Sequence, residues 1–230
     1  MLSVKDKLHR IKAYDWKKLF LELIVVFLGV TAGFLLNNWQ LQRQDSSLEK
    51  KYLSGFLQDA VQNIAELRTA VKADSIWLSA TKPKLIAIQK GRITLDSADN
   101  LVKQIVKISK ADIQNGTYED IINSGNLHII SNYELKKEIV NYHVTISGVE
   151  FIDNYFYKYF NEFVMPFVFS NYNILAGKLD DPKIIRKSQF GNIVTGYYSM
   201  VQQRKASYEG LLNKSIALKD KLKELNITTD

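Results

Sequence analysis

The 230-residue sequence contains no cysteine and is poor in proline, glycine and histidine. Without cysteine, the chain has no disulfide framework, no thiolate zinc site and no cysteine nucleophile. Its three prolines and eleven glycines exclude collagen-like and proline-rich architectures, and their scarcity favours long helices. The three histidines leave little material for a histidine-rich metal site. We therefore expect a helical protein with no metal site and no cofactor.

Sequence motifs of known catalytic chemistry are also missing. The chain has no phosphate-binding glycine loop, GxGxxG turn, HExxH zinc motif, EF-hand loop or GxSxG nucleophile elbow. His143 has no paired nucleophile, so a half-buried, hydrogen-bonded histidine is the favoured interpretation. We predict no catalytic residue, no cofactor-binding residue and no metal ligand, and we do not expect an enzyme.

Positive charge is concentrated at the N-terminus. The formal net charge is +7, and residues 1–18 alone hold six bases against two acids. The rest of the chain is nearly balanced, with 25 bases and 22 acids. A nucleic-acid-binding domain would spread its bases along a folded face. Bases that crowd in front of an apolar run indicate a membrane protein instead, so we expect no nucleic-acid partner.

The longest apolar run covers residues 19–36 and reads LFLELIVVFLGVTAGFLL, with Glu22 as its one charge. Eighteen residues at 1.5 Å each give about 27 Å of helix, which is enough to cross a bilayer core. Tryptophan occurs on both sides of the run and lysine before it, as at bilayer interfaces. We predict a transmembrane helix over residues 19–39 whose membrane-interface residues are Trp16, Lys17, Lys18 and Trp39.

The bases around this run also predict its orientation. Six precede it, and only Arg43, Lys50 and Lys51 follow within fifteen residues. The positive-inside rule then places the N-terminus in the cytoplasm and the chain after the span in the periplasm of a bacterium. Because the run continues past a possible cleavage site at residues 30–32, an uncleaved signal anchor is preferred over a cleaved signal peptide.

Polar and small residues in and before the span have further expected roles. Glu22 is interpreted either as an i,i+4 partner of Lys18 near the headgroups or as a contact with another subunit. The spacing of Gly29 and Gly33 would let two helices approach closely, in a dimer or with a partner helix. Residues 1–18 are predicted to form a basic amphipathic helix on the cytoplasmic leaflet, or else a basic flank that only sets topology.

Residues 40–230 show helical periodicity almost throughout. Apolar stripes predict long helices over about residues 46–80, from Ser131 until Pro166 kinks or ends the helix, and over about residues 188–225. One ionisable residue interrupts each stripe: Asp74, Asp153 and Arg204. We predict an all-α fold, in which an N-terminal transmembrane helix is followed by an antiparallel bundle of three long and several short helices.

Shorter elements are placed by proline, glycine and capping residues. Pro83 predicts a helix boundary, followed by a short helix over residues 84–90 that Gly91 ends. Further short helices are expected near residues 101–109 and at 117–124. Two apolar runs could each be read as a short strand, although too isolated to form a sheet; they are 92–95 and 127–130. The predicted domains are a cytoplasmic arm, a span and an extracytoplasmic bundle, at residues 1–18, 19–39 and 40–230.

Ten of the 26 aromatic residues lie within residues 151–172. One helix face cannot hold them all, and we assign Phe156, Phe160 and Phe163 to the core. For the others, a partner interface, simple exposure and a surface that touches the outer leaflet stay open. The candidate partner-interface residues are Tyr155, Tyr157, Tyr159 and Phe169.

Two stretches resemble a family of single-pass membrane proteins found in bacteroidete genomes. Residues 20–39, with Glu22 and the Asn37-Asn38-Trp39 exit, resemble that family's Glu-containing span, which ends in Asn-x-Trp. Residues 117–135, which include the Ser124-Gly125-Asn126-Leu127 turn, resemble its Tyr-Glu-x-Leu…Ser-Gly-x-Leu segment, although isoleucine stands where leucine is usual. The family has no assigned activity. The resemblance therefore implies a membrane location and supplies no mechanism.

The sequence as a whole predicts a membrane-anchored helical protein that works through protein contacts, as a subunit of an inner-membrane or envelope assembly. Its expected partners are the lipid bilayer and other envelope subunits or a second copy. Two alternatives stay open. An extracytoplasmic sensor or ligand-binding bundle would gather Asn154, Arg204 and Asp153 around a pocket, whereas a pore-type effector would use Glu22 and the glycine face.

Overall fold

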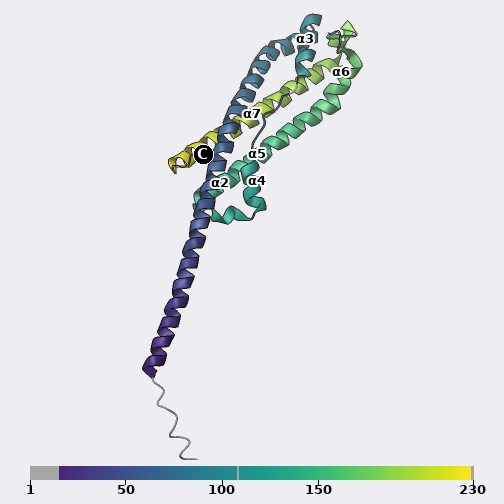
Figure 1. The fold of residues 1–230 in the computed structure, drawn as a ribbon. Helices are drawn as coiled ribbons and strands as arrows, with labels where there is room; N and C mark the ends of the chain where they lie inside the picture. Colours follow the sequence, from purple (N-terminus) through teal and green to yellow (C-terminus); the bar gives the residue numbers. More distant parts are fainter. Residues whose placement is uncertain (1–15, 108, 229–230) are drawn as a thin grey trace, which may run out of the picture. The chain divides into compact units, whose positions relative to one another are not determined.

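A computed structural model describes residues 16–107 and 109–228, and its secondary structure is almost entirely helical (Figure 1). The all-α fold class predicted from the sequence is therefore confirmed. The chain forms two units, residues 1–48 and residues 49–230, each of which is described by itself. The predicted amphipathic helix of residues 1–18 lies, except for its last three residues, outside the part of the chain that the structure describes.

Helix α2 (Trp16–Gln89) is one continuous α-helix that contributes residues to both units. The predicted boundary at Pro83 is wrong, because Pro83 lies inside α2 and the expected helix over residues 84–90 is its last part. Proline removes one intrahelical hydrogen bond, but Leu78, Leu85 and Ile88 on either side pack against the core and hold the helix together.

The C-terminal end of α2 is set by Gly91, as the sequence predicts. Gly91 has φ +60°, a left-handed conformation that glycine adopts without a steric penalty. Its N–H donates to the carbonyl of Ile88 at 3.0 Å, and the N–H of Arg92 donates to that of Ala87 at 2.8 Å. This pair of bonds is a Schellman cap, which satisfies the last carbonyls of the helix.

The second unit is a bundle of three long helices: the part of α2 after residue 48, α5 (Tyr133–Tyr159) and α7 (Ser188–Glu224). Helix α7 is antiparallel to the other two. Its start lies beside Ile88 of α2, and Thr228 just beyond its end bonds Ser54 of α2. The three predicted stripes form much of the core of this bundle, since most of their apolar residues are buried.

The chain returns from the end of α2 to the start of α5 through a segment of short elements that does not form one continuous helix. Helix α3 (Leu95–Ile105) is followed by residues 106–107 and 109–115, which form no helix, and then by helix α4 (Gly116–Asn123) and a 3-10 turn, η1 (Asn126–Ile129). Neither possible strand formed: residues 92–94 are loop, and residues 127–129 belong to η1. We call residues 106–131 the return segment.

Beyond Tyr159, helix α5 passes into a π-helical turn, η2 (Phe160–Val164), and then into α6 (Met165–Asn171). Pro166 does not end the helical stretch, because η2 continues directly into α6. Pro166 lies in the first turn of α6, where a missing N–H is tolerated. The π turn holds one more residue than an α turn, which shifts the inward face by one position. Val164 is therefore buried and Phe163 is 54% exposed, so the assignment of Phe163 to the core was wrong.

A small hairpin follows α6 and was not predicted. Strands β1 (Tyr172–Asn173) and β2 (Lys178–Leu179) pair antiparallel, with Tyr172 opposite Leu179. A 3-10 turn, η3 (Pro182–Arg186), then leads into α7. The hairpin, η3 and α3 lie together at one end of the bundle (Figure 1), which we call the distal end.

Candidate functional site

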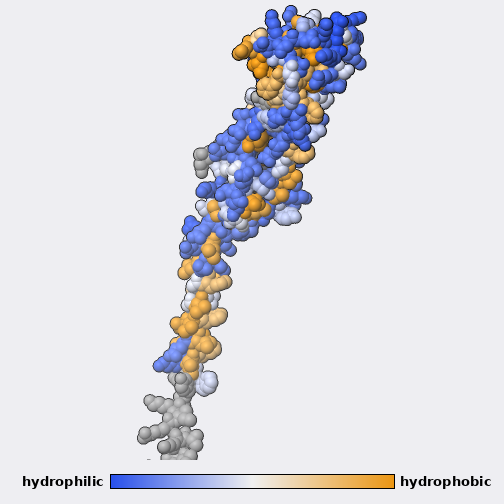
Figure 2. Space-filling view, turned by 90° about the vertical axis from the view of Figure 1, so that its right-hand side faces the viewer, coloured by the Kyte–Doolittle hydropathy of each residue, from blue (hydrophilic) through white to orange (hydrophobic). Residues whose placement is uncertain are grey.

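The apolar segment, residues 19–36, retains its helical form as part of α2. Its 18-residue window has a mean hydropathy of 2.5, and none of it is buried against the rest of the protein. Within the described residues, α2 is the one helix long and apolar enough to cross a membrane. Figure 2 shows hydrophobic side chains over the visible side of the segment. It is therefore a candidate membrane span by length and composition.

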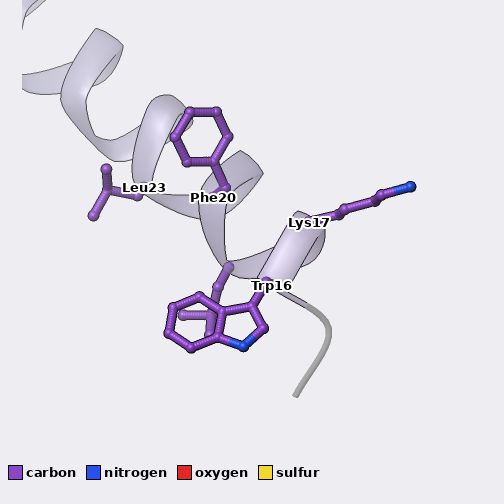
Figure 3. Close-up of a pocket in the computed structure, with 5 residues that line it drawn as sticks. Trp16, Lys17, Phe20 and Leu23 are labelled. Carbon is purple, nitrogen blue, oxygen red and sulfur yellow. The ribbon is translucent and has the colours of Figure 1, made fainter. Parts of the chain in front are cut away.

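The predicted interface residues lie around the two ends of the apolar segment and are exposed. Figure 3 shows the side chains of Trp16, Lys17, Phe20 and Leu23 projecting outward from a single helix, so the hollow between them is not an enclosed cavity. At the other end, the guanidinium of Arg43 lies 4.8 Å from the ring centre of Trp39. This cation–π contact is one that sequence reasoning missed.

Glu22, Gly29 and Gly33 all lie on open helix surface. The ion pair expected between Lys18 and Glu22 is not formed, although the structure describes both side chains. A Cβ atom added at either glycine would meet no atom within 4 Å. The glycine face is thus free of contacts within the chain, as a helix-packing surface requires.

Of the four aromatic residues predicted to form a partner interface, three lie in α5 and Phe169 lies in α6. Tyr155 is exposed, Tyr157 is half-buried, and Phe169 is 70% exposed on α6. Tyr159 is instead part of the packing, since its hydroxyl donates to the carbonyl of Ile193 on α7 at 3.0 Å. Their place in a partner interface stays a prediction.

A groove of about 700 Å³ lies between the η2–α6 segment and the start of α7. Aromatic rings and amide side chains line much of it, among them Tyr159, Phe163, Phe167, Asn171, Gln189 and Asn192. Phe163 was expected in the core, yet here it borders an open hollow. We refer to this groove as the aromatic groove.

Gly196 forms part of the wall of the aromatic groove because no side chain fits there. A Cβ atom at this position would lie 2.7 Å from Cζ of Tyr159, far inside van der Waals contact. We expect Gly196→Ala to displace Tyr159 and lower the free energy of unfolding by about 1–3 kcal/mol. The matched change Gly148→Ala, where a Cβ meets nothing within 4 Å, should raise it by about 0.5–1 kcal/mol. Urea unfolding of the two full-length variants gives the comparison, and equal effects would contradict this account.

The interior of the bundle contains an ion pair between Asp74 of α2 and Arg204 of α7. Arg204 donates from Nε to Oδ2 at 3.1 Å and from Nη2 to Oδ1 at 2.5 Å, and both side chains are buried. Its remaining Nη1 donates to the carbonyl of Ser109 at 3.1 Å. Burial alone would lower the pKa of Arg204, but the hydrogen bonds and attraction to Asp74 outweigh burial and raise it. The guanidinium therefore stays charged, and each of its three nitrogens donates a hydrogen bond.

A second buried acid, Asp153 of α5, lies beside this pair. Its Oδ1 accepts a hydrogen bond from the hydroxyl of Tyr208 at 2.8 Å, and that hydroxyl accepts one from the N–H of Ala111 at 3.3 Å. Burial raises the pKa of Asp153 above its ordinary value, and it also raises the pKa of Tyr208. Tyr208 therefore stays protonated and links Asp153 to the return segment.

Replacing Asp153 by asparagine is expected to leave the protein at least as stable as the wild type at pH 7. The amide is uncharged, and its Oδ1 can still accept from Tyr208. In the wild type, the raised pKa favours the folded state most below the ordinary value of 3.8, and that stability is lost as the pH rises through the folded pKa. The advantage of Asp153→Asn should thus vanish on acidification. Urea unfolding between about pH 3 and pH 7 measures it, and a variant clearly less stable at pH 7 would contradict it.

Earlier in α2 than Asp74, Asn63 binds the return segment through both the oxygen and the nitrogen of its side-chain amide. Its Oδ1 accepts from the N–H of Gln114 at 2.6 Å, and its Nδ2 donates to the carbonyl of Gln114 at 2.9 Å. The same Nδ2 donates to the hydroxyl of Tyr142, which in turn lies 3.0 Å from Oγ of Ser215. One buried network thus joins all three long helices to the return segment.

Other side chains of α2, nearer its entry into the bundle, also form hydrogen bonds with the return segment. Asp59 accepts from the N–H of Thr117 at 3.2 Å, and Glu49 accepts from the N–H of Ser131 at 2.7 Å. Between them, the hydroxyl of Tyr52 lies 3.0 Å from Oγ of Ser124. Because a broken helix cannot satisfy its own backbone groups, side chains of the long helices take the place of the missing partners. These polar groups therefore have a structural role.

Because these polar side chains hold the return segment, few of them are available for metal binding or ligand binding. Within the described residues, no group of three or more His, Cys, Asp or Glu side chains could hold a metal ion. His143 is half-buried, 3.1 Å from Oδ1 of Asn115, and stacks on Tyr118 at 3.8 Å, as the sequence predicts. Asn154 is exposed, whereas Arg204 and Asp153 are buried and bonded to other residues, so these three do not line a common pocket.

No protein-family model, curated protein or solved structure matches this chain. The resemblance to the bacteroidete family therefore stays a prediction that depends on the two stretches quoted above.

Proposed function

We propose that this protein is a membrane-anchored helical module that binds other proteins of the bacterial inner membrane or envelope and carries out no catalysis itself. The apolar segment crosses the inner membrane once. The basic residues before it support a cytoplasmic N-terminus, with the bundle on the periplasmic side.

One observation carries this proposal: eighteen consecutive residues form a helix whose apolar side chains are exposed all round. Exposing that much apolar surface to water costs about 25 cal/mol per Å², and soluble monomers rarely show apolar patches of this extent. A bilayer removes the cost because its hydrocarbon core is as apolar as the side chains. Trp16 and Trp39 then lie near the level of the headgroups.

Protein binding is favoured over catalysis by how the bundle uses its polar groups. Polar side chains such as Asn63 and Arg204 hold the return segment, while the aromatic groove presents rings and amides to the outside. Aromatic side chains with a few hydrogen-bonding groups are typical of protein interfaces. The groove is therefore the surface at which we expect a partner subunit to bind.

The test is to purify the full chain in mild detergent, measure its mass and identify what co-purifies. We expect a defined complex, either with a partner subunit or with a second copy. Phe163→Ser in the aromatic groove should release that complex, whereas Val144→Ser, an exposed apolar residue of α5 that does not line the groove, should retain it. A wild-type chain that is a lone monomer without partners would overturn the proposal.

A further inference from the structure

The turn of the β1–β2 hairpin holds the most exposed apolar side chain of the described residues. Leu175 is fully exposed and its neighbour Ile174 is 60% exposed. The turn is nevertheless well bonded: Asn173 accepts from the N–H of Ala176 through Oδ1 at 2.9 Å and from that of Gly177 through its carbonyl at 2.8 Å. Ile174 and Leu175 are thus held outward by an ordered turn.

The hairpin is also fixed to the bundle behind it. Asp99 of α3 is buried and accepts from the N–H of Leu179 at 2.8 Å, and Tyr172 and Leu179 belong to the core at this end. The N–H of Asp180 donates to the carbonyl of Asn171 at 3.0 Å. With its base anchored, the hairpin cannot fold Leu175 back into the core.

Exposed basic residues lie in the elements next to this turn in the chain. Lys178 lies in β2, and Lys183, Arg186 and Lys187 follow in and after η3; all four are exposed. Ile93, four residues after the end of α2, belongs to the same hydrophobic core cluster as Leu179 and Ile184. Residues 88–96 and 172–191 together hold six bases and three acids. The bases are Lys90, Arg92, Lys178, Lys183, Arg186 and Lys187; the acids are Asp96, Asp180 and Asp181.

We propose that the distal end binds the surface of an anionic lipid bilayer, with Ile174 and Leu175 entering the headgroup region and the bases contacting lipid phosphates. Apolar side chains ringed by lysine and arginine are the pattern that anionic membranes attract. The pairing of exposed apolar side chains with nearby lysine and arginine favours an anionic lipid surface as the occupant, because the apolar groups enter the headgroup region while the bases contact phosphates. This inference does not depend on the apolar segment or on the aromatic groove.

The experiment uses the full chain in nanodiscs of neutral phosphatidylcholine, so that the apolar segment is occupied and no anionic lipid is present beforehand. The discs are mixed with vesicles of phosphatidylcholine alone or with half phosphatidylglycerol, and bound protein is measured by flotation. We expect roughly tenfold or stronger binding to the anionic vesicles, and weaker binding in high salt because exposed charges are screened.

Two sets of substitutions locate the binding. Ile174→Ser with Leu175→Ser should weaken vesicle binding by roughly tenfold or more. Lys183→Gln, Arg186→Gln and Lys187→Gln together should weaken it as much and reduce its salt dependence. The matched control is Ile76→Ser with Val144→Ser, two exposed apolar residues away from the hairpin, which should bind like the wild type. All these side chains are exposed, and circular dichroism checks that each variant is folded.

Equal binding to both kinds of vesicle, or binding that survives the change at Ile174 and Leu175, would overturn this inference. If soluble polyglutamate binds as tightly as the vesicles and the serine variant retains it, the distal end is a site for an acidic protein instead. Incorporation into nanodiscs is scored separately, so a failure of the membrane anchor is distinguishable from a failure of lipid binding at the distal end.

Discussion

Replacing Asp74 by asparagine is expected to lower the free energy of unfolding by about 3–5 kcal/mol. The side chain keeps its shape, but Arg204 stays charged and loses the ionised partner at 2.5 Å and 3.1 Å. A buried charge without its counter-charge is costly because the interior does not solvate it as water does. Thermal or urea unfolding of the full chain in mild detergent, followed by circular dichroism, measures the loss.

Two controls separate the ion pair from a general effect of changing a buried acid. Asp153→Asn, which removes the other buried carboxylate nearby, should cost nothing at pH 7. Asp74→Leu combined with Arg204→Met should regain most of the loss from Asp74→Asn, because an apolar pair leaves no buried charge. A loss below about 1 kcal/mol for Asp74→Asn alone would show that the pair is solvated and would contradict this account.

Two arginines in the apolar segment are expected to remove the chain from the membrane. Each arginine near the middle of a span costs about 2.5–3.5 kcal/mol, so Val26→Arg with Val30→Arg costs about 5–7 kcal/mol of insertion free energy. Both side chains lie on exposed helix surface, so neither change disturbs contacts within the protein. Carbonate extraction of vesicles should release the double variant and leave the wild type in the pellet.

The matched control places the same charge on the same helix outside the apolar segment. Val61→Arg with Ile76→Arg changes two exposed residues of α2 within the bundle and should leave the chain in the membrane fraction. A wild-type chain that carbonate releases would contradict the anchor, and so would a Val26 and Val30 variant that stays embedded.

The ionisable residues that interrupt the apolar stripes could be recognised from the sequence, but their partners could not. Asp74 and Arg204 are recognisable in the sequence as exceptions on buried faces, and so is Asp153. Their partners are not recognisable, because Asp74 and Arg204 are 130 residues apart and meet only when α2 and α7 pack antiparallel. One alternative hypothesis placed Asn154, Arg204 and Asp153 around a ligand pocket. In the packed bundle, Arg204 bonds Asp74 and the carbonyl of Ser109 instead, and Asp153 accepts from Tyr208.

Errors in the local predictions have related causes. Proline lowers the stability of a helix locally, but core contacts on both sides of Pro83 outweigh one lost hydrogen bond. The π turn at η2 shifts the helix face by one residue, and no apolar periodicity marks that shift, so Phe163 was assigned to the wrong side. The β1–β2 hairpin is too short to produce a strand pattern in the sequence.

The sequence by itself determined the apolar segment, the helical class and the residues on the buried face of each long helix. These features depend on composition and on spacing over a few turns, which are local properties of the chain. Only the tertiary structure decided which buried polar residues meet, which aromatic residues border a groove and which apolar side chains stay outside. Those outcomes depend on contacts between residues far apart in the chain, and they form only when the long helices and the return segment pack together.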